Sequence, residues 1–196
     1  PMAHTVQQAS LLVDVAKNKS LIYAVGYMKR YDPGIQTARK LFVDLCSSGR
    51  LGAFSCGHFY NHSKSCAHTP PSHQRPMESR SHRFQTWPLF PDWIPYPFQE
   101  SYAWYLNSAS HDINLINYFF EAPLEIVSSN ILVNGTACTI FKGADFLVSL
   151  DISKAETGSW AEGGELIFEQ GRISFVIPSP MDVEGVTGVW LEENAV

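Results

Sequence analysis

The 196-residue sequence contains no long apolar run, few cysteines and no excess of positive charge. No stretch approaches the roughly 20 apolar residues that a membrane-spanning helix requires, and no charged-then-apolar signal segment opens the chain. A formal net charge of -5 argues against nucleic acid as a partner. We therefore expect a soluble, cytoplasmic protein with neither a membrane nor a nucleic-acid partner.

The four cysteines are too few and too irregularly spaced for a disulfide scaffold, and no Cys-x-x-Cys pair occurs. Histidines do gather around Cys66, at positions 58, 62, 68, 73 and 82. They do not form the two close ligand pairs that are typical of structural zinc sites. We expect reduced thiols and no metal site.

Three nucleotide and catalytic motifs are also missing: Gly-x-Gly-x-x-Gly, Gly-x-x-x-x-Gly-Lys-Ser/Thr and Gly-x-Ser-x-Gly. The first two bind nucleotide phosphates, and the third carries the nucleophile of acyl transfer. The chain therefore has no nucleotide-binding or acyl-transfer signature of its own.

What the sequence does contain is enough apolar residues, 45%, to bury the core of one domain over residues 1–196. A capping box and apolar residues at helical spacing predict a helix over residues 5–18. Residues 21–28 are predicted to form a buried strand. A second helix over residues 35–45 should end near Gly49, and residues 53–60 are predicted to form the next strand.

Residues 61–99 lose all periodicity and contain seven prolines, which predicts a long loop. Loops of this length in compact domains are functional or disordered, and the interleaved aromatic residues favour an ordered lid or interface arm. Arg75, Arg80 and Arg83 make the loop locally basic. We favour solvation or contact with another subunit over anion binding for these three side chains.

The second half predicts a helix from His111 to about Glu121, followed only by strands. Asn134-Gly135 and Gln170-Gly171 are the turn signals between the strands. The expected strands cover residues 124–133, 136–141, 146–152, 160–169 and 172–177. They predict an α+β fold, in which a largely antiparallel meander forms an open-faced sheet with helices packed on one face.

Two motifs supply the candidate functional residues. The first is Val25-Gly26-Tyr27-Met28-Lys29-Arg30-Tyr31-Asp32, and the second is His111-Asp112-Ile113-Asn114-Leu115. A histidine at a helix N-terminus stays neutral, because the helix dipole disfavours the imidazolium, and it can then accept a proton near neutral pH. The alternative is an ordinary capping or half-buried histidine.

The neighbouring residues have two possible roles. Arg30, at the end of a buried strand, needs a partner, which is either a substrate oxygen or an internal acid. Tyr27 lines the same cleft or fills core space, and Lys29 is expected to be solvated. Asp112 and Asn114, in the first helical turn, are interpreted first as capping residues.

Together the two motifs resemble those of the Gfo/Idh/MocA oxidoreductases, in which a Val-Gly-aromatic-x-x-Arg strand end and a helix-opening histidine face a sugar-like substrate. The resemblance covers about residues 1–178. It implies a dihydrodipicolinate-reductase-like C-terminal domain, which binds substrate and mediates oligomerisation. Pro1 matches the proline of the family's Glu-Lys-Pro motif, a cofactor-site position. The N-terminal dinucleotide-binding Rossmann domain is therefore expected to precede this chain.

The resemblance also implies site roles. His111 is expected to be catalytic, and Arg30, Tyr27 and Asp112 are expected to lie near the substrate. Asn107 stands where many family members carry aspartate; its amide can orient a hydroxyl but cannot act as a base.

The resemblance implies hydride transfer between NAD or NADP and a sugar, cyclitol or related polyol, and pairing of copies through the open sheet face. Without the Rossmann domain, this chain is expected to bind no cofactor tightly and to be inactive. The alternative is a non-catalytic ligand-binding or assembly module that has kept the fold, and Asn107 favours it.

Overall fold

The computed structural model describes residues 2–63, 90–121, 124–154, 160–182 and 184–194. Its helices are α1 (Val6–Asn18), α2 (Pro33–Ser48) and α3 (Gln99–Phe120), with two short 3-10 helices, η1 (Met28–Tyr31) and η2 (Tyr96–Phe98). Its strands are β1 (Phe54–Ser63), β2 (Glu125–Ile131), β3 (Ala137–Lys142), β4 (Leu147–Lys154), β5 (Ala161–Phe168), β6 (Gly171–Ile177) and β7 (Gly188–Glu193). None of the described helices is long and apolar enough to cross a bilayer.

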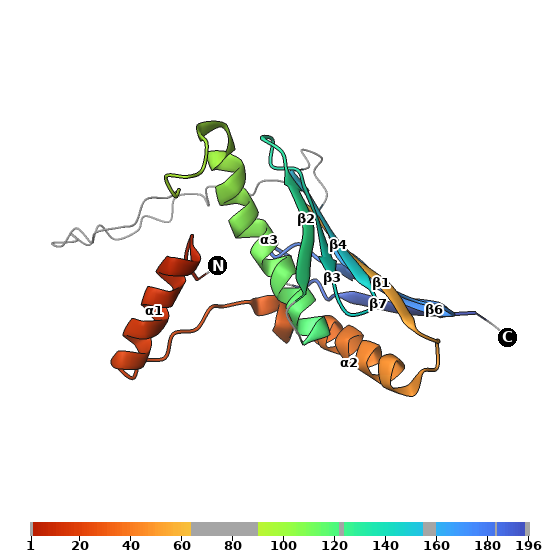
Figure 1. Cartoon of the computed structure of the whole chain (residues 1–196). Helices are drawn as coiled ribbons and strands as arrows, with labels where there is room; N and C mark the ends of the chain where they lie inside the picture. Colours follow the sequence, from red (N-terminus) through yellow and green to blue (C-terminus); the bar gives the residue numbers. More distant parts are fainter. Residues whose placement is uncertain (1, 64–89, 122–123, 155–159, 183, 195–196) are drawn as a thin grey trace.

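The seven described strands form one mixed sheet in the order β2-β3-β4-β1-β5-β6-β7. Figure 1 shows α2 and α3 against one face of this sheet, which confirms the predicted α+β fold. All neighbouring strands are antiparallel except β1 and β4, which are parallel. The expected simple meander is therefore wrong at the centre of the sheet. Strand β1 precedes the other strands in the sequence, and it lies between β4 and β5 in the sheet.

Local sequence explains where α1 and α2 begin and where α2 ends. The Thr5 hydroxyl accepts a hydrogen bond from the Gln8 backbone N–H at 3.2 Å, as the capping box predicts. Asp32 caps α2 by accepting from the Ile35 N–H at 3.0 Å. Gly49 ends α2 with a φ of 64°, a left-handed conformation that glycine adopts without a Cβ clash.

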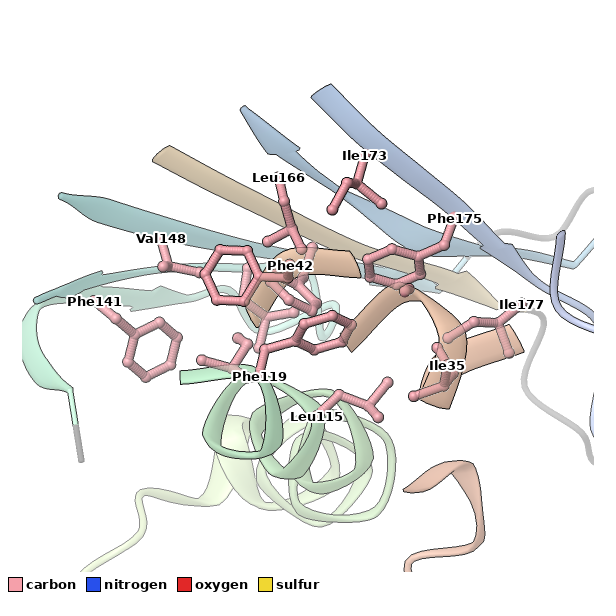
Figure 2. Close-up of a cluster of buried hydrophobic side chains, with 14 of the residues drawn as sticks. Ile35, Phe42, Leu115, Phe119, Phe141, Val148, Leu166, Ile173, Phe175 and Ile177 are labelled. Atoms are coloured by element: carbon pink, nitrogen blue, oxygen red, sulfur yellow. The ribbon is translucent and has the colours of Figure 1, made fainter. Parts of the chain in front are cut away.

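The hydrophobic core lies between the sheet and the two helices. Figure 2 shows Phe42 of α2 and Phe119 of α3 meeting inward-facing side chains of the strands. The rings of Phe119 and Phe175 stack with centroids 5.4 Å apart. Apolar residues alternate with outward ones along β3, β4 and β6, so only one sheet face contributes to this core.

The prediction of a buried strand over residues 21–28 is wrong. Residues 21–27 run without strand pairing, and Met28 begins η1. The Ile22 side chain is 98% exposed, and Leu21 is 64% exposed. The apolar run is real, but no strand in the described part of the chain lies beside it to form a ladder. Figure 1 shows this segment and α1 standing away from the sheet.

The predicted loop over residues 61–99 is shorter than expected at both ends. Strand β1 continues through Asn61 to Ser63, and α3 already begins at Gln99. Residues 64–89, with their arginines and most of the clustered histidines, lie outside the described residues. Strand β7, which pairs with β6 beyond the last predicted strand, had no clear sequence signal.

Candidate functional site

The candidate site forms where several segments meet at one edge of the sheet. Because β1 and β4 run parallel, their C-terminal ends share this edge, with Ser63 opposite Lys154. Strand β5 begins at the same edge, where Glu162 pairs with Asn61 of β1. Helix α3 brings Asp112 to this pair, and η1 brings Lys29.

A buried charged cluster occupies this edge. The Lys29 ammonium contacts the Glu162 carboxylate directly and lies 3.7 Å from Asp112 Oδ1. Asn61 Nδ2 donates to Asp112 Oδ2 at 3.0 Å, and Trp160 Nε1 donates to Glu162 Oε2 at 3.1 Å. We call these five residues the Lys29 cluster.

Burial contradicts two predictions for this cluster. The Lys29 side chain is 11% exposed, so it is not solvated as predicted. The Asp112 side chain is 3% exposed and lies in the middle of α3, so it is not a cap of the first turn. The Asp112 prediction assumed that the helix begins at His111. The Lys29 prediction assumed that a strand continues through Lys29.

The charges of the Lys29 cluster do not balance, because two carboxyl groups share one ammonium. Burial raises the pKa of Asp112, and the Lys29 charge and the Asn61 hydrogen bond only partly offset this effect. Burial likewise lowers the pKa of Lys29 against the attraction of Asp112. An uncompensated buried charge is costly, so the cluster is best balanced when one carboxyl group retains a proton.

His111 lies next to this cluster but not at a helix start. Helix α3 begins at Gln99, so the predicted helix-dipole effect on His111 is wrong. The half-buried ring packs edge-on against Tyr27, with centroids 5.6 Å apart. Burial first, and the nearby Lys29 charge second, lower the pKa of His111 below 6.5. The ring is therefore neutral at pH 7, as expected, but for a different reason.

One ring nitrogen of His111 and one oxygen of Asn61 lack partners. His111 Nδ1 and Asn61 Oδ1 are enclosed, and neither has a hydrogen-bond partner among the described residues. Asn107 lies one turn before His111 on the same side of α3 and is exposed. Unpaired buried polar atoms are rare in folded proteins, and here both lie at the candidate site.

Arg30 connects η1 to α3. Its Nε donates to Asn114 Oδ1 at 2.6 Å, its Nη2 donates to the Asn114 carbonyl at 3.4 Å, and its guanidinium lies 5.1 Å from the Tyr118 ring centroid. Of the two partners expected for Arg30, the structure shows an internal one, although it is an amide rather than an acid. Asn114 therefore positions Arg30 instead of capping the helix.

Sequence reasoning brought His111, Tyr27 and Asp112 to the site but missed Glu162, Asn61 and Trp160. A signal for Glu162 was available. In β5 it occupies the same alternating face as Leu166 and Phe168, both core residues, and a charge at a core-facing position calls for a partner. Pro1, the expected cofactor-site residue, lies outside the described residues.

The arrangement combines a neutral histidine with an excess of hydrogen-bond acceptors, and it can bind hydroxyl groups and accept a proton from one of them. Within the segments that the structure describes, no three His, Cys, Asp or Glu side chains converge as metal ligands. The side chains of the site support general base catalysis or hydroxyl recognition.

No protein-family model and no curated protein matches the chain. Solved structures do match. A levoglucosan dehydrogenase in complex with NADH is 16% identical with a TM-score of 0.60, covering 100% of this chain and 53% of that one. A putative myo-inositol dehydrogenase from Sinorhizobium meliloti 1021 is 15% identical with a TM-score of 0.61, covering 98% and 54%. A probable dehydrogenase from Thermotoga maritima is 16% identical with a TM-score of 0.61, covering 96% and 53%.

At these identities the matches establish the fold. That fold is the one found in these three dehydrogenase structures. The chain spans about half the length of the solved structures it matches.

Proposed function

We propose that this chain is the substrate-binding and oligomerisation domain of an NAD(P)-dependent oxidoreductase acting on a sugar, cyclitol or related polyol. The main support is the position of His111, a neutral histidine beside the Lys29 cluster, in a fold shared with sugar and inositol dehydrogenases. In one of these structures, the levoglucosan dehydrogenase, the bound cofactor is NADH.

In this proposal His111 is the general base. NAD or NADP, when bound, supplies the hydride acceptor. Because His111 Nδ1 is enclosed, Nε2 is the nitrogen left to accept the proton of a substrate hydroxyl. The lowered pKa of His111 keeps that nitrogen unprotonated at neutral pH. Asn107 orients a hydroxyl through its amide, and Tyr27 holds the imidazole ring edge-on.

The nicotinamide end of the cofactor has a suitable place beside α3. A groove of about 680 Å³ lies between the start of α1 and the first turns of α3. Trp93, Tyr102 and Leu106 provide flat and apolar walls, and His4 adds an enclosed Nδ1 without a partner among the described residues. Such a lining fits a planar, partly polar ring.

We further propose that an N-terminal dinucleotide-binding domain of the same polypeptide covers α1 and residues 21–27. Helix α1 has no buried residue, and it exposes Val6, Leu11 and Val15 by 79%, 57% and 56%. The following extended segment exposes Ile22 and offers unpaired backbone groups. An apolar, strand-ready segment of this kind is suited to join the edge of a neighbouring sheet.

Replacing Ile22 with asparagine tests this docking. We expect the stability of the 196-residue chain to change by less than about 0.5 kcal/mol, because the side chain is already exposed. In the full-length protein the same change should lower the melting temperature of the dinucleotide-binding domain and weaken cofactor affinity. Chemical denaturation measures the stability of the 196-residue chain. Thermal melting and a cofactor titration measure the two effects in the full-length protein. Equal effects in the two forms would contradict the docking.

The sheet face turned away from α2 and α3, the open face, is proposed to pair copies of the protein. Its central row carries His58, Tyr60 and His62, whose neighbouring ring centroids lie 5.7 and 5.8 Å apart. Val176 and Trp190 add apolar area and are 45% and 52% exposed. A mixed aromatic and aliphatic face that no described helix covers (Figure 1) is suited to a symmetric, self-complementary interface.

The proposed activity is tested on the full-length protein with NAD⁺ and NADP⁺ and a set of sugars and cyclitols, by following the absorbance of reduced nicotinamide. Saturable, substrate-dependent reduction is the expected result. The second candidate, a non-catalytic ligand-binding or assembly module, is favoured by Asn107, which cannot share a proton. Binding of a polyol without any turnover would support that second candidate.

A further inference from the structure

We propose that Glu162 determines the substrate class: by occupying Lys29, it restricts the site to uncharged, hydroxyl-rich ligands and disfavours carboxylated or phosphorylated sugars. The proposal rests on the proposed function, because it assumes that the ligand binds beside His111 and the Lys29 cluster. It assigns a role to a residue of β5 that lies far in sequence from both functional motifs.

The first support is that both cations of the first motif are already engaged. Lys29 is held between Glu162 and Asp112, and Arg30 is held by Asn114 and Tyr118. A ligand carboxylate or phosphate binds tightly where a cation is free to pair with it. Lys29, which two acids hold, offers no such pairing, and the partners of Arg30 fix its guanidinium against α3.

The second support is the excess of acceptors in the cluster. Each carboxyl oxygen of Asp112 and Glu162 has one partner among Lys29, Asn61 and Trp160, and a carboxylate oxygen can accept a second hydrogen bond. Asn61 Oδ1 is a further enclosed acceptor without a partner in the described part of the chain. Ligand hydroxyls can donate hydrogen bonds to such acceptors, whereas the carboxylate or phosphate group of an anionic ligand has only acceptors and brings negative charge toward two carboxyl groups.

Of the two acids, Glu162 is the one that controls Lys29. Its side chain is fully buried and contacts the ammonium directly, whereas Asp112 lies 3.7 Å from the ammonium and is also held by Asn61. A Glu162→Gln substitution keeps the shape of the side chain and an oxygen that can accept from Trp160. It removes the carboxylate that contacts the ammonium directly and leaves Asp112, 3.7 Å away, as the nearest acid, so the ammonium can pair with a ligand anion.

The test uses the full-length protein and matched neutral and anionic ligands: glucose with glucuronate, galactose with galacturonate, and myo-inositol with inositol 1-phosphate. For the wild type we expect kcat/KM to favour the neutral member of each accepted pair. Glu162→Gln should shift this ratio toward the anionic member by about tenfold, as expected for one partly screened charge. Saturation-transfer NMR measures the binding preference in parallel, so the preference is tested even without turnover.

Glu165→Gln is the matched control, because Glu165 lies on the same strand but on the open face, where it pairs with Arg172 at 3.5 Å. It should leave the ratio unchanged. Three results would overturn the proposal. The wild type could use the neutral and anionic ligands equally or bind neither of them, or the kcat/KM ratio of Glu162→Gln could equal that of Glu165→Gln. If the protein binds the neutral ligands in preference to the anionic ones but reduces no nicotinamide, the proposed oxidoreductase activity is rejected. The role of Glu162 in ligand selection is then still supported.

Discussion

Replacing Lys29 with methionine is expected to lower the free energy of unfolding by about 3–5 kcal/mol, the cost of leaving buried charges without their partner. Asp112 and Glu162 would remain in the core with only the Asn61 and Trp160 hydrogen bonds to stabilise them. Urea denaturation followed by far-UV circular dichroism measures the loss.

Lys154→Met is the matched control for this substitution. Lys154 also forms an ion pair, with Glu100 at 3.4 Å, but the Glu100 side chain is 91% exposed. Exposed pairs contribute about 0–1 kcal/mol, so the control should lose no more than that. A Lys29→Met loss as small as the control would show that the Lys29 cluster is hydrated and not buried.

The pH dependence of Lys29→Met provides an independent check. In the wild type the pKa of Asp112 is raised above 3.8 by burial, so this group adds stability below that pH and loses it as pH rises through the folded pKa. Without Lys29, Asp112 loses the charge that offsets part of this rise, so its pKa moves further up. The loss caused by Lys29→Met should therefore shrink as pH falls and Asp112 becomes protonated.

His111→Ala is expected to reduce kcat/KM of the full-length enzyme by about 100- to 10,000-fold, the range typical of removing a general base. The fold should persist, because the ring is only half-buried and one of its nitrogens has no partner among the described residues. Steady-state turnover and a melting curve measure the two effects separately. Retention of full activity would show that His111 is not the base.

A pH profile distinguishes a base from a merely structural histidine. The pKa of His111 lies below 6.5, so wild-type kcat/KM should be level at neutral pH and fall only below that value, as the ring becomes protonated. His111→Ala should lose this acidic limb along with the activity. Asn117→Ala, an exposed position on the same helix, should keep both the rate and the limb.

Much of the fold was predictable because it depends on short-range patterns. Capping by Thr5 and Asp32, the left-handed end at Gly49 and the alternating strands of the second half follow from local hydrogen bonding and from periodicity. The start of α3 was missed although Tyr102, Tyr105, Leu106 and Ala109 recur at helical spacing, because this stretch directly follows a proline-rich segment. That error alone displaced the expected roles of His111 and Asp112.

The sequence by itself determined the α+β class and identified two motifs, whose residues Tyr27 and His111 the structure brings into contact. Only the tertiary structure decided which charges meet. Lys29, Asp112 and Glu162 come from η1, α3 and β5, and their contact depends on β1 lying between β4 and β5. Strand order and long-range ion pairs arise from the packing of distant segments, and a periodic pattern records which face a residue occupies but not what it meets there.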